Sequence, residues 1–357
     1  MKVAVVLGTR PEFIKLSSFL REAPKSFKVI PIHTGQHYDL NMSEGVIKEL
    51  KLPKMKYHIK LPKTGFEKQL AKMSVDLGEI FKKEKPDYVL VQGDTNSAMM
   101  GALIGRRLGI EVIHVEAGCR SFDKRSPEEQ NRKLIDSISD IYFCADRKSV
   151  DHLRNEGVTK KVFFSGSTVF DAAKWASMAK SDVLEKFKLK NESYVVATLH
   201  RAENMEDLTE FKQKIEFINQ TAKLMPVVFP IHPRTKKFLK EKNIQLAKEV
   251  KVIPPQTYLP FIVILKNCRF VISDSGGIQE EAAFFNRPCL ILRDATEWTR
   301  LVDIKKNFLI KKITKKTTQL VDKIINDDTF YRENRLIKAP GIGTGATNKI
   351  ISKIKNG

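Results

Sequence analysis

Short, nearly continuous apolar runs alternate along the chain with longer stretches in which apolar residues recur at helical spacing. The short runs predict buried β-strands, and the longer stretches predict amphipathic helices. The predicted strands of the first half are 2–7, 28–33, 88–91, 111–115, 141–144 and 161–165. Those of the second half are 194–199, 226–231, 269–272 and 288–292. Strands that alternate with helices predict an α/β fold with parallel, doubly wound sheets.

The series of strands and helices breaks off near residues 166–192 and restarts at Tyr194. Because 357 residues exceed a typical single core, two domains are expected. We therefore predict two Rossmann-like domains that face a cleft. The N-terminal domain takes residues 1–166, with a last helix at 345–357 that packs back on it, and the C-terminal domain takes residues 167–344.

Ionisable residues gather directly after the predicted strands. In chain order they are Arg10, His33, Asp94, Glu116, His200, His232, Asp274 and Glu297. A purely structural turn would hold Gly, Asn or Ser, and burial of an ionisable group is costly unless the group is paired or used. Since α/β sheets bind ligands at the carboxyl ends of their strands, this distribution predicts an active site there.

One strand of the second half ends in Ser273-Asp-Ser-Gly-Gly277 and continues directly into a helix. Ser275 is a suitable N-cap, and Gly276 and Gly277 let a ligand approach the first helical turn closely. Backbone amides at a helix N-terminus favour a phosphate or diphosphate. Glu280 and Glu281 follow half a turn later, where a carboxylate is placed to accept hydrogen bonds from ribose hydroxyls. The plainer alternative is a capped helix that binds nothing.

The first strand leads in the same way into Gly8-Thr-Arg-Pro-Glu12, and Thr9 has capping-box spacing to Glu12. We interpret Arg10 as a ligand clamp, because a guanidinium group matches the geometry of a phosphate. Lys15 is a second base near this turn. The turn is therefore a second candidate for phosphate binding.

Three carboxylates, Asp94, Glu116 and Glu128, are expected to form a cluster at neighbouring strand ends. Carboxylates that share a site push their pKa values apart, which leaves one acid and one base for proton transfer. Glu128 taken alone is equally well explained as an acid in the first turn of a helix, where the dipole favours it. His200, next to Arg201, is a further candidate for acid–base chemistry or phosphate contact.

Composition describes an ordinary globular protein, with 42% apolar and 29% charged residues. No apolar run reaches the roughly 18 residues of a membrane span, so we expect a cytoplasmic protein. The four cysteines lie far apart and without CxxC spacing, which indicates reduced, buried thiols. The histidines do not cluster with them, so no metal site is expected.

A net charge of +21 is compatible with a nucleic acid, a membrane surface or a polyanionic substrate as partner. The lysines, however, are scattered over many predicted helices, and no basic strand carries interleaved aromatic residues. A solvated basic surface is the favoured interpretation, without nucleic acid or membrane as a partner. The charge would still speed encounters with an anionic nucleotide.

Several motifs together resemble the non-hydrolysing UDP-N-acetylglucosamine 2-epimerases over almost the whole chain. In the order of that family they are Gly8-Thr-Arg-Pro-Glu12 with Ile14 and Lys15, Thr34-Gly-Gln-His37, Gly93-Asp-Thr95, His114-Val-Glu-Ala-Gly118, Pro127-Glu-Glu129 with Asn131 and Arg132, His200-Arg-Ala-Glu-Asn204, and Ser273-Asp-Ser-Gly-Gly-Ile-Gln-Glu-Glu281. The resemblance implies a GT-B fold, a homodimer, and conversion of UDP-GlcNAc to UDP-ManNAc without a cofactor. It also implies elimination of UDP to an enzyme-held 2-acetamidoglucal, followed by re-addition.

The resemblance also assigns roles to individual positions. Asp94, Glu116 and Glu128 match catalytic carboxylates, and His200 matches an essential histidine. The residues that match or are assigned to substrate binding are Arg10, Lys15, Gln36, His37, Phe261, Asp274, Ser275, Gly276, Gly277 and Glu281. Of these, Phe261 matches the segment on the uracil side.

The chain departs from the commonest pattern of the family at two places. Thr296-Glu-Trp-Thr-Arg300 replaces Thr-Glu-Arg-Pro-Glu and looks similar to relatives that act on UDP-2,3-diacetamido-2,3-dideoxyglucuronate. Arg300 would then meet a sugar carboxylate, unless it is a solvated charge. Ser137 stands where many members carry histidine. A GT-B glycosyltransferase and a non-catalytic binder of nucleotide sugars or nucleic acid are the other functions considered.

Overall fold

The computed structural model describes residues 1–36, 40–63, 65–123, 125–201, 203–338 and 341–356. The chain divides into two compact units. Unit 1 comprises Met1–Ala172 and Pro340–Gly357, and unit 2 comprises Ala173–Ala339. The boundary at residue 172 lies inside α8 (Thr168–Ser177), and the last helix, α18 (Ala346–Lys355), belongs to unit 1 and contacts its helix α2.

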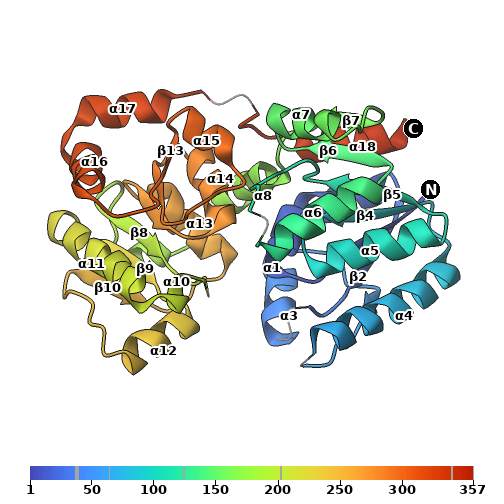
Figure 1. Cartoon of the computed structure of the whole chain (residues 1–357), viewed down its shortest axis with the longest axis horizontal. Coiled ribbons are helices and arrows are strands. Elements are labelled where there is room, and N and C mark those ends of the chain that lie inside the picture. Colours follow the sequence, from blue (N-terminus) through green and yellow to red (C-terminus); the bar gives the residue numbers. More distant parts are fainter. Residues whose placement is uncertain (37–39, 64, 124, 202, 339–340, 357) are drawn as a thin grey trace. The chain divides into compact units, whose positions relative to one another are not determined.

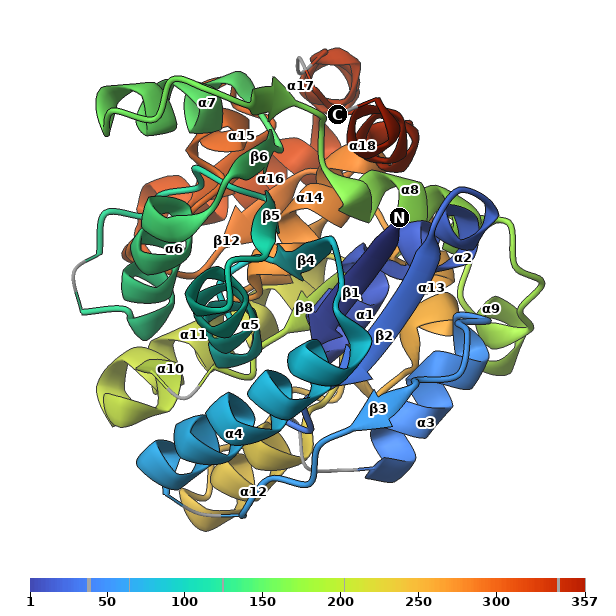
Figure 2. The same cartoon turned by 90° about the vertical axis from the view of Figure 1, so that its right-hand side faces the viewer.

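Unit 1 contains a parallel sheet that, among the described residues, has seven strands in the order β3-β2-β1-β4-β5-β6-β7. These are β1 (Lys2–Leu7), β2 (Lys28–His33), β3 (Tyr57–His58), β4 (Tyr88–Gln92), β5 (Glu111–Val115), β6 (Ile141–Cys144) and β7 (Val162–Phe164). Figure 2 shows β2, β1 and β4 side by side, and the register pairs Ala4 with Ile30 and Val89. Because every pair is parallel, all carboxyl ends lie along one edge of the sheet.

Helices cover both faces of this sheet. They are α1 (Arg10–Lys15), α2 (Ser17–Glu22), α3 (Leu40–Glu49), α4 (Phe66–Glu84), α5 (Asn96–Arg107), α6 (Pro127–Ile138), α7 (Arg147–Asn155), α8 and α18, with a 3₁₀ turn at Ala23–Lys25. Helices α4, α5 and α6 lie next to one another over one face, as Figure 1 shows. Their apolar side chains pack on alternate strand residues such as Val6, Ile30 and Val91, because successive strand side chains point to opposite faces.

Unit 2 repeats the design with a parallel sheet that, within the described part of the chain, has six strands in the order β10-β9-β8-β11-β12-β13. These are β8 (Val195–Thr198), β9 (Val227–Pro230), β10 (Val250–Ile253), β11 (Val271–Ser273), β12 (Cys289–Ile291) and β13 (Asn307–Leu309). Its helices are α9 (Val183–Lys186), α10 (Glu203–Glu206), α11 (Leu208–Leu224), α12 (Pro233–Glu241), α13 (Tyr258–Asn267), α14 (Gly276–Phe284), α15 (Thr299–Asp303), α16 (Lys315–Asn326) and α17 (Asp328–Leu336).

All ten strands predicted from apolar runs are present, within one or two residues at each end. The count of four strands in the second half was wrong, because β10 and β13 also join the sheet, and β3 was missed in the first half. All three are edge strands, and β3 and β13 have only two and three residues. Lys251 interrupts the apolar run of β10. An edge strand is partly exposed and needs no continuous apolar run, so periodicity alone does not detect it.

Candidate active-site residues at the strand ends

The turn after β1 is organised by the carboxylate of Glu12, which is only 1% exposed. Thr9 and Glu12 form the predicted capping box at the start of α1. Glu12 Oε2 accepts hydrogen bonds from the backbone N–H groups of Gly8 and Thr9 at 2.9 and 2.8 Å, and from the Thr9 hydroxyl at 2.9 Å. Its other oxygen accepts from the hydroxyl of Thr95, at the end of β4, at 2.7 Å. Arg10, the first residue of α1, is partly exposed at this edge.

Glu116 follows β5 and is held by two polar side chains from neighbouring elements. Lys15 Nζ lies 2.6 and 2.7 Å from its two carboxylate oxygens, and Gln92 Nε2 donates to Oε2 at 2.6 Å. Glu116 has a left-handed backbone with φ = 69°, which is unusual for a residue with a side chain. Lys15 and Glu116, which were predicted as site residues but not as partners, therefore meet, and the strained turn aims the carboxylate at the strand-end edge.

Asp94 lies after β4, next to β5 in the sheet, so the structure places it on the same edge as Glu116. Its carboxylate pairs with Arg132 of α6, and Asn131 Nδ2 donates to its backbone carbonyl at 2.9 Å. Arg132 also pairs with the buried Glu129 at 2.9 Å. Roles for Arg132 and Glu129 were not predicted. The sequence did contain a signal for their pairing, because Glu129 and Arg132 have opposite charges and lie three residues apart on one predicted helix.

Glu128 is the third predicted carboxylate, and it is exposed on the first turn of α6. Its described hydrogen bond comes from the hydroxyl of Ser126 at 2.7 Å. The structure therefore does not join Glu128 to Asp94 or Glu116 by a described contact. A helix dipole accounts for an acid at this position without any catalytic role, and the predicted role stays a prediction.

A buried network ties the turn that carries Asp94 to the turn that follows Glu116. His114 Nε2 lies 2.8 Å from the carbonyl oxygen of Gly93, and its Nδ1 lies 2.7 Å from Asp136 Oδ1. Asp136 also accepts from the Gly118 amide at 3.1 Å and pairs with Arg120 at 2.8 Å. Burial raises the pKa of Asp136, but His114 and Arg120 outweigh burial and hold that pKa below its ordinary value.

Gln36, a predicted substrate ligand, is turned toward α5 in this structure. Its Oε1 accepts from the Ser97 amide at 2.9 Å and from the Ser97 hydroxyl at 2.6 Å. Close approach of these turns depends on Gly8, where a Cβ would lie 2.0 Å from Thr34 Oγ1. His37, predicted beside Gln36, lies outside the described residues.

In unit 2 the buried Asp274 organises the turn after β8. Its Oδ2 accepts from the amides of His200 and Arg201, both at 2.9 Å, and from Asn204 Nδ2 at 2.8 Å. Its Oδ1 lies 3.1 Å from His200 Nδ1. Burial raises the pKa of Asp274, but the His200 ring and these amides outweigh burial and hold that pKa below its usual range. The exposed fraction of the His200 side chain is 39%, so its ring is available to a ligand.

The predicted phosphate turn has the expected backbone form. Ser275 is the N-cap of α14, with φ = −82° and ψ = 136°, and its side chain makes no cap hydrogen bond within the described part of the chain. A Cβ on Gly276 would lie 2.2 Å from Glu297 Oε1, whereas one on Gly277 would meet no described atom within 4 Å. A side chain at 276 would thus displace the Glu297 carboxylate, and glycine at 277 leaves open space at the first helical turn.

Two other predicted ligands of unit 2 lie on helices near this turn. Glu281 is 6% exposed on α14. Phe261 is partly buried on α13. Their predicted roles stay predictions.

Arg300 is not a solvated charge, which was one of the two interpretations of this residue. It is 8% exposed, and its NH2 group lies 3.2 Å from Glu280 Oε1, a carboxylate buried at 0%. Its guanidinium carbon lies 5.8 Å from the centre of the Trp298 ring, and that ring is itself buried. The pairing with Glu280 accounts for Arg300 without a substrate, and contact with a sugar carboxylate stays a prediction.

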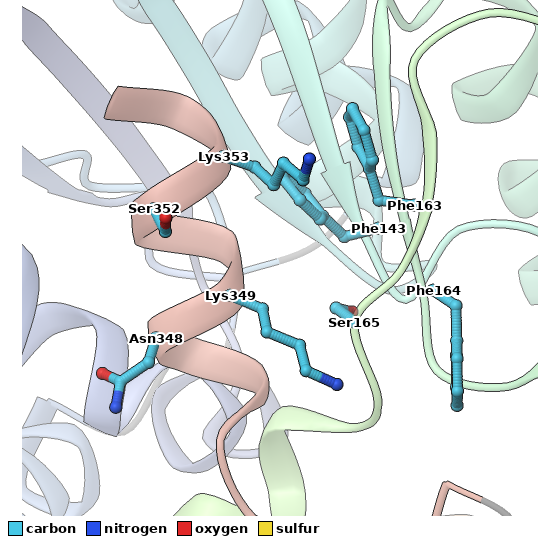
Figure 3. A pocket seen from close by; sticks show the side chains of 8 residues that line it. All are labelled: Phe143, Phe163, Phe164, Ser165, Asn348, Lys349, Ser352 and Lys353. Carbon is cyan, nitrogen blue, oxygen red and sulfur yellow. The ribbon is translucent and has the colours of Figure 1, made fainter. Parts of the chain in front are cut away.

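One pocket within unit 1 is separate from these residues. It encloses about 390 Å³ and is lined by Phe143, Phe163, Phe164, Ser165, Asn348, Lys349, Ser352 and Lys353. Figure 3 shows the two lysines extending from α18 toward the aromatic side chains, and their ammonium nitrogens lie 5.0 Å (Lys353) and 5.6 Å (Lys349) from ring centres. None of the predicted site residues lines this pocket.

Among the described residues, no three His, Cys, Asp or Glu side chains gather as a metal site would require. None of the described helices combines the length and the apolar composition that a membrane crossing needs.

Two doubly wound α/β units with ionisable residues at their strand ends define a class of proteins that bind nucleotides and related ligands at those ends. The family model described as UDP-N-acetylglucosamine 2-epimerase matches residues 20–355. The chain belongs to this family of epimerases, which confirms the resemblance seen in the motifs.

Relatives and solved structures agree with this family. UDP-N-acetylglucosamine 2-epimerase of Methanococcus maripaludis is 38% identical over 99% of this chain and 98% of its own. UDP-2,3-diacetamido-2,3-dideoxy-D-glucuronate 2-epimerase of Pseudomonas aeruginosa is 38% identical over 87% of this chain and 88% of its own. The crystal structure of Methanocaldococcus jannaschii UDP-GlcNAc 2-epimerase with UDP-GlcNAc and UDP has a TM-score of 0.89 and 38% identity, with 100% of both chains covered. The predicted α/β class with two Rossmann-like domains is thereby confirmed.

Proposed function

We propose that the protein interconverts UDP-GlcNAc and UDP-ManNAc by eliminating UDP and adding it back on the 2-acetamidoglucal. The observation that carries the proposal is the placement of Asp94 and Glu116 on one strand-end edge of unit 1, in a chain of the UDP-N-acetylglucosamine 2-epimerase family. A solved relative at 38% identity holds UDP-GlcNAc and UDP, which supports this substrate.

The hydrogen at C2 of the sugar is not acidic, so its removal requires a positioned base and a good leaving group at C1. Glu116 and Asp94 are proposed to hold and move this proton. Each carboxylate forms an ion pair with a basic side chain, Glu116 with Lys15 and Asp94 with Arg132. These contacts fix the orientation of the carboxylates before substrate binds. A proton returned on the opposite face of the 2-acetamidoglucal inverts C2.

The departing diphosphate develops negative charge, and donors placed in advance stabilise that charge. In unit 2 the amides of the Ser275–Gly277 turn and the ring of His200 are proposed to provide these donors. Asp274 fixes the His200 backbone and faces its Nδ1, which leaves Nε2 to meet a phosphate oxygen. Arg10, at the strand-end edge of unit 1, is proposed as a guanidinium contact for a phosphate group.

Turnover of UDP-GlcNAc in deuterium oxide tests the proposal. NMR should show UDP-ManNAc and deuterium at C2 of both epimers, because the proton passes through solvent-exchanging side chains. An epimer without deuterium at C2, or no epimer from either UDP sugar named here, would contradict it.

A second candidate substrate is UDP-2,3-diacetamido-2,3-dideoxyglucuronate. The 38% identical relative of Pseudomonas aeruginosa that bears this name, together with the Thr296-Glu-Trp298 segment, favours it. The burial of Arg300 against Glu280 removes one reason to expect a carboxylated sugar. Parallel incubations with each UDP sugar, followed at C2 by NMR, decide between the two by their kcat/KM ratio.

We further propose that the protein works as a homodimer in the cytoplasm, as the resemblance to the family implies. Light scattering on the purified chain should give twice the mass of 40.8 kDa. A monomer with full epimerase activity would contradict the dimer.

A further inference from the structure

Glu12 is a buried carboxylate to which the proposed mechanism gives no task. A capping box requires only that the two side chains of one helix end exchange hydrogen bonds with the backbone. The box of α16, Thr314 with Thr317, uses hydroxyl groups alone. At the start of α1 the same motif uses a carboxylate that is 1% exposed, and burial of a carboxylate is costly unless its oxygens are fully bonded. The extra cost points to a task beyond capping.

The additional contact of Glu12 reaches a second strand end. While Oε2 bonds the turn after β1, Oε1 accepts from the Thr95 hydroxyl at 2.7 Å. Thr95 is the N-cap of α5, with its side chain accepting from the Ala98 amide at 3.0 Å, and it directly follows Asp94. One carboxylate therefore joins the turn that carries Arg10 to the turn that carries Asp94.

We propose that Glu12 is a positioning residue that holds the Asp94 turn in register with the Arg10 turn. The proposal rests on the proposed function for its catalytic consequence, because Asp94 is the side chain that the tie places. A displacement of reacting groups by about 1 Å can cost on the order of 100-fold in rate. Loss of the tie should therefore lower kcat and leave KM nearly unchanged.

The hydrogen-bond pattern shows how to separate position from charge. Gly8 and Thr9 need an acceptor only at Oε2, and the Thr95 hydroxyl, which donates to Oε1, can instead accept from an N–H group in the place of Oε1. A neutral glutamine can therefore offer its oxygen to the first turn and donate its amide to Thr95. Burial also raises the pKa of Glu12 to about 7, so this site is compatible with a neutral side chain.

The experiment compares Glu12→Gln, Glu12→Ala and Glu12→Asp in the full-length protein, with epimerisation of the UDP sugar as the readout. Glu12→Gln should keep kcat within about threefold of the wild type, because both turns stay bonded. Glu12→Ala should lose about 10- to 100-fold in kcat. Glu12→Asp, one methylene shorter, reaches only one turn and should resemble the alanine variant. Thr314→Ala is the matched control, since it removes a capping box elsewhere and should leave kcat unchanged.

A glutamine variant as inactive as the alanine variant would mean that charge matters rather than position, and would overturn the proposal. An alanine variant with a lower Tm but an unchanged kcat would mean a purely structural role, and would also overturn it. Hydrogen exchange of the amides of residues 8–12 and 93–98 provides a readout that needs no activity. Exchange should accelerate in both turns in Glu12→Ala and in neither turn in Glu12→Gln. If the wild type epimerises no UDP sugar, the proposed function fails while this exchange result still decides the role of Glu12.

Discussion

The strand ends of unit 1 and those of unit 2 use charge in opposite ways. In unit 1 the carboxylates of Glu116 and Asp94 lie at the strand-end edge of the sheet. Basic side chains of α1 and α6 form ion pairs with them. In unit 2 the carboxylate of Asp274 is fully buried, it holds the partly exposed His200, and it directly precedes the Ser275–Gly277 turn with its backbone amides. One edge thus offers acids, and the other offers hydrogen-bond donors.

The difference matches the two tasks of an elimination that expels a diphosphate. Removal of a proton from carbon needs a carboxylate that is oriented but accessible. Stabilisation of the leaving group needs donors that are fixed before charge develops. The same fold, built twice, can carry either task, because the residues that follow its strands can vary while the apolar strands keep the fold. Substitutions in the two units should therefore separate chemistry from nucleotide binding.

The largest effect is expected for Glu116→Gln. The amide keeps the shape but cannot take a proton, so kcat should fall by roughly 10²- to 10⁴-fold while the Kd for UDP changes less than about twofold. Glu111→Gln, at the other end of β5, is the control and should leave both values unchanged. Isothermal titration with UDP and steady-state kinetics measure the two quantities. A large loss of UDP affinity in Glu116→Gln would break the contrast between the units.

A smaller effect concerns stability and pH in unit 1. Burial raises the pKa of Glu12 from 4.5 to about 7, so the folded protein retains a proton that the unfolded chain releases. The free energy of unfolding should therefore fall as pH rises from 4.5 to about 7 and level off above that. Glu12→Gln removes this pH dependence. The free energies of unfolding of the variant and the wild type should therefore diverge by up to about 3 kcal/mol between pH 4.5 and about 7. Urea denaturation at several pH values measures it, and parallel curves would refute the assignment.

Asp274 of unit 2 should make the free energy of unfolding depend on pH with the opposite sign. The pKa of Asp274 is held below the ordinary 3.8, so its contribution to stability is present above that pH and is lost as pH falls below it. Asp274→Asn can keep its oxygen on the two backbone N–H groups but loses the carboxylate charge, and it should cost about 1–3 kcal/mol at neutral pH. The deficit should shrink in acid. A deficit that stays constant down to about pH 2 would show that the carboxylate charge is irrelevant.

The smallest effects are expected at the two glycines of α14. Gly276→Ala should lower Tm and raise the Kd for UDP about tenfold, because its Cβ meets Glu297. The Cβ of Gly277→Ala meets no described atom, so this variant should raise the Kd for UDP by a similar factor without lowering Tm. The second variant is the control for the first. Unchanged UDP affinity in Gly277→Ala would show that the nucleotide does not approach this turn.

Much of this contrast was predictable because buried parallel strands are continuous apolar runs. The apolar runs place Asp94 and Glu116 directly after two consecutive predicted strands, while the order of the strands in the sheet is set by the tertiary structure. The pairing of Lys15 with Glu116 and the burial of Arg300 were not predictable in this way. A charged side chain reads as solvated unless its partner is known, and here the partners lie 101 and 20 residues away along the chain.

The amino-acid sequence by itself determined the α/β class, the main strands, the family and the strand-end positions of the candidate site residues. Those properties follow from local periodicity and from residue types at fixed spacing. Only the tertiary structure decided that Glu12 bonds two turns, that Glu128 stays exposed while Glu129 is buried, and that Arg300 pairs with Glu280. These outcomes depend on which distant groups meet in the folded chain, and the free energy of a buried charge is set by those partners.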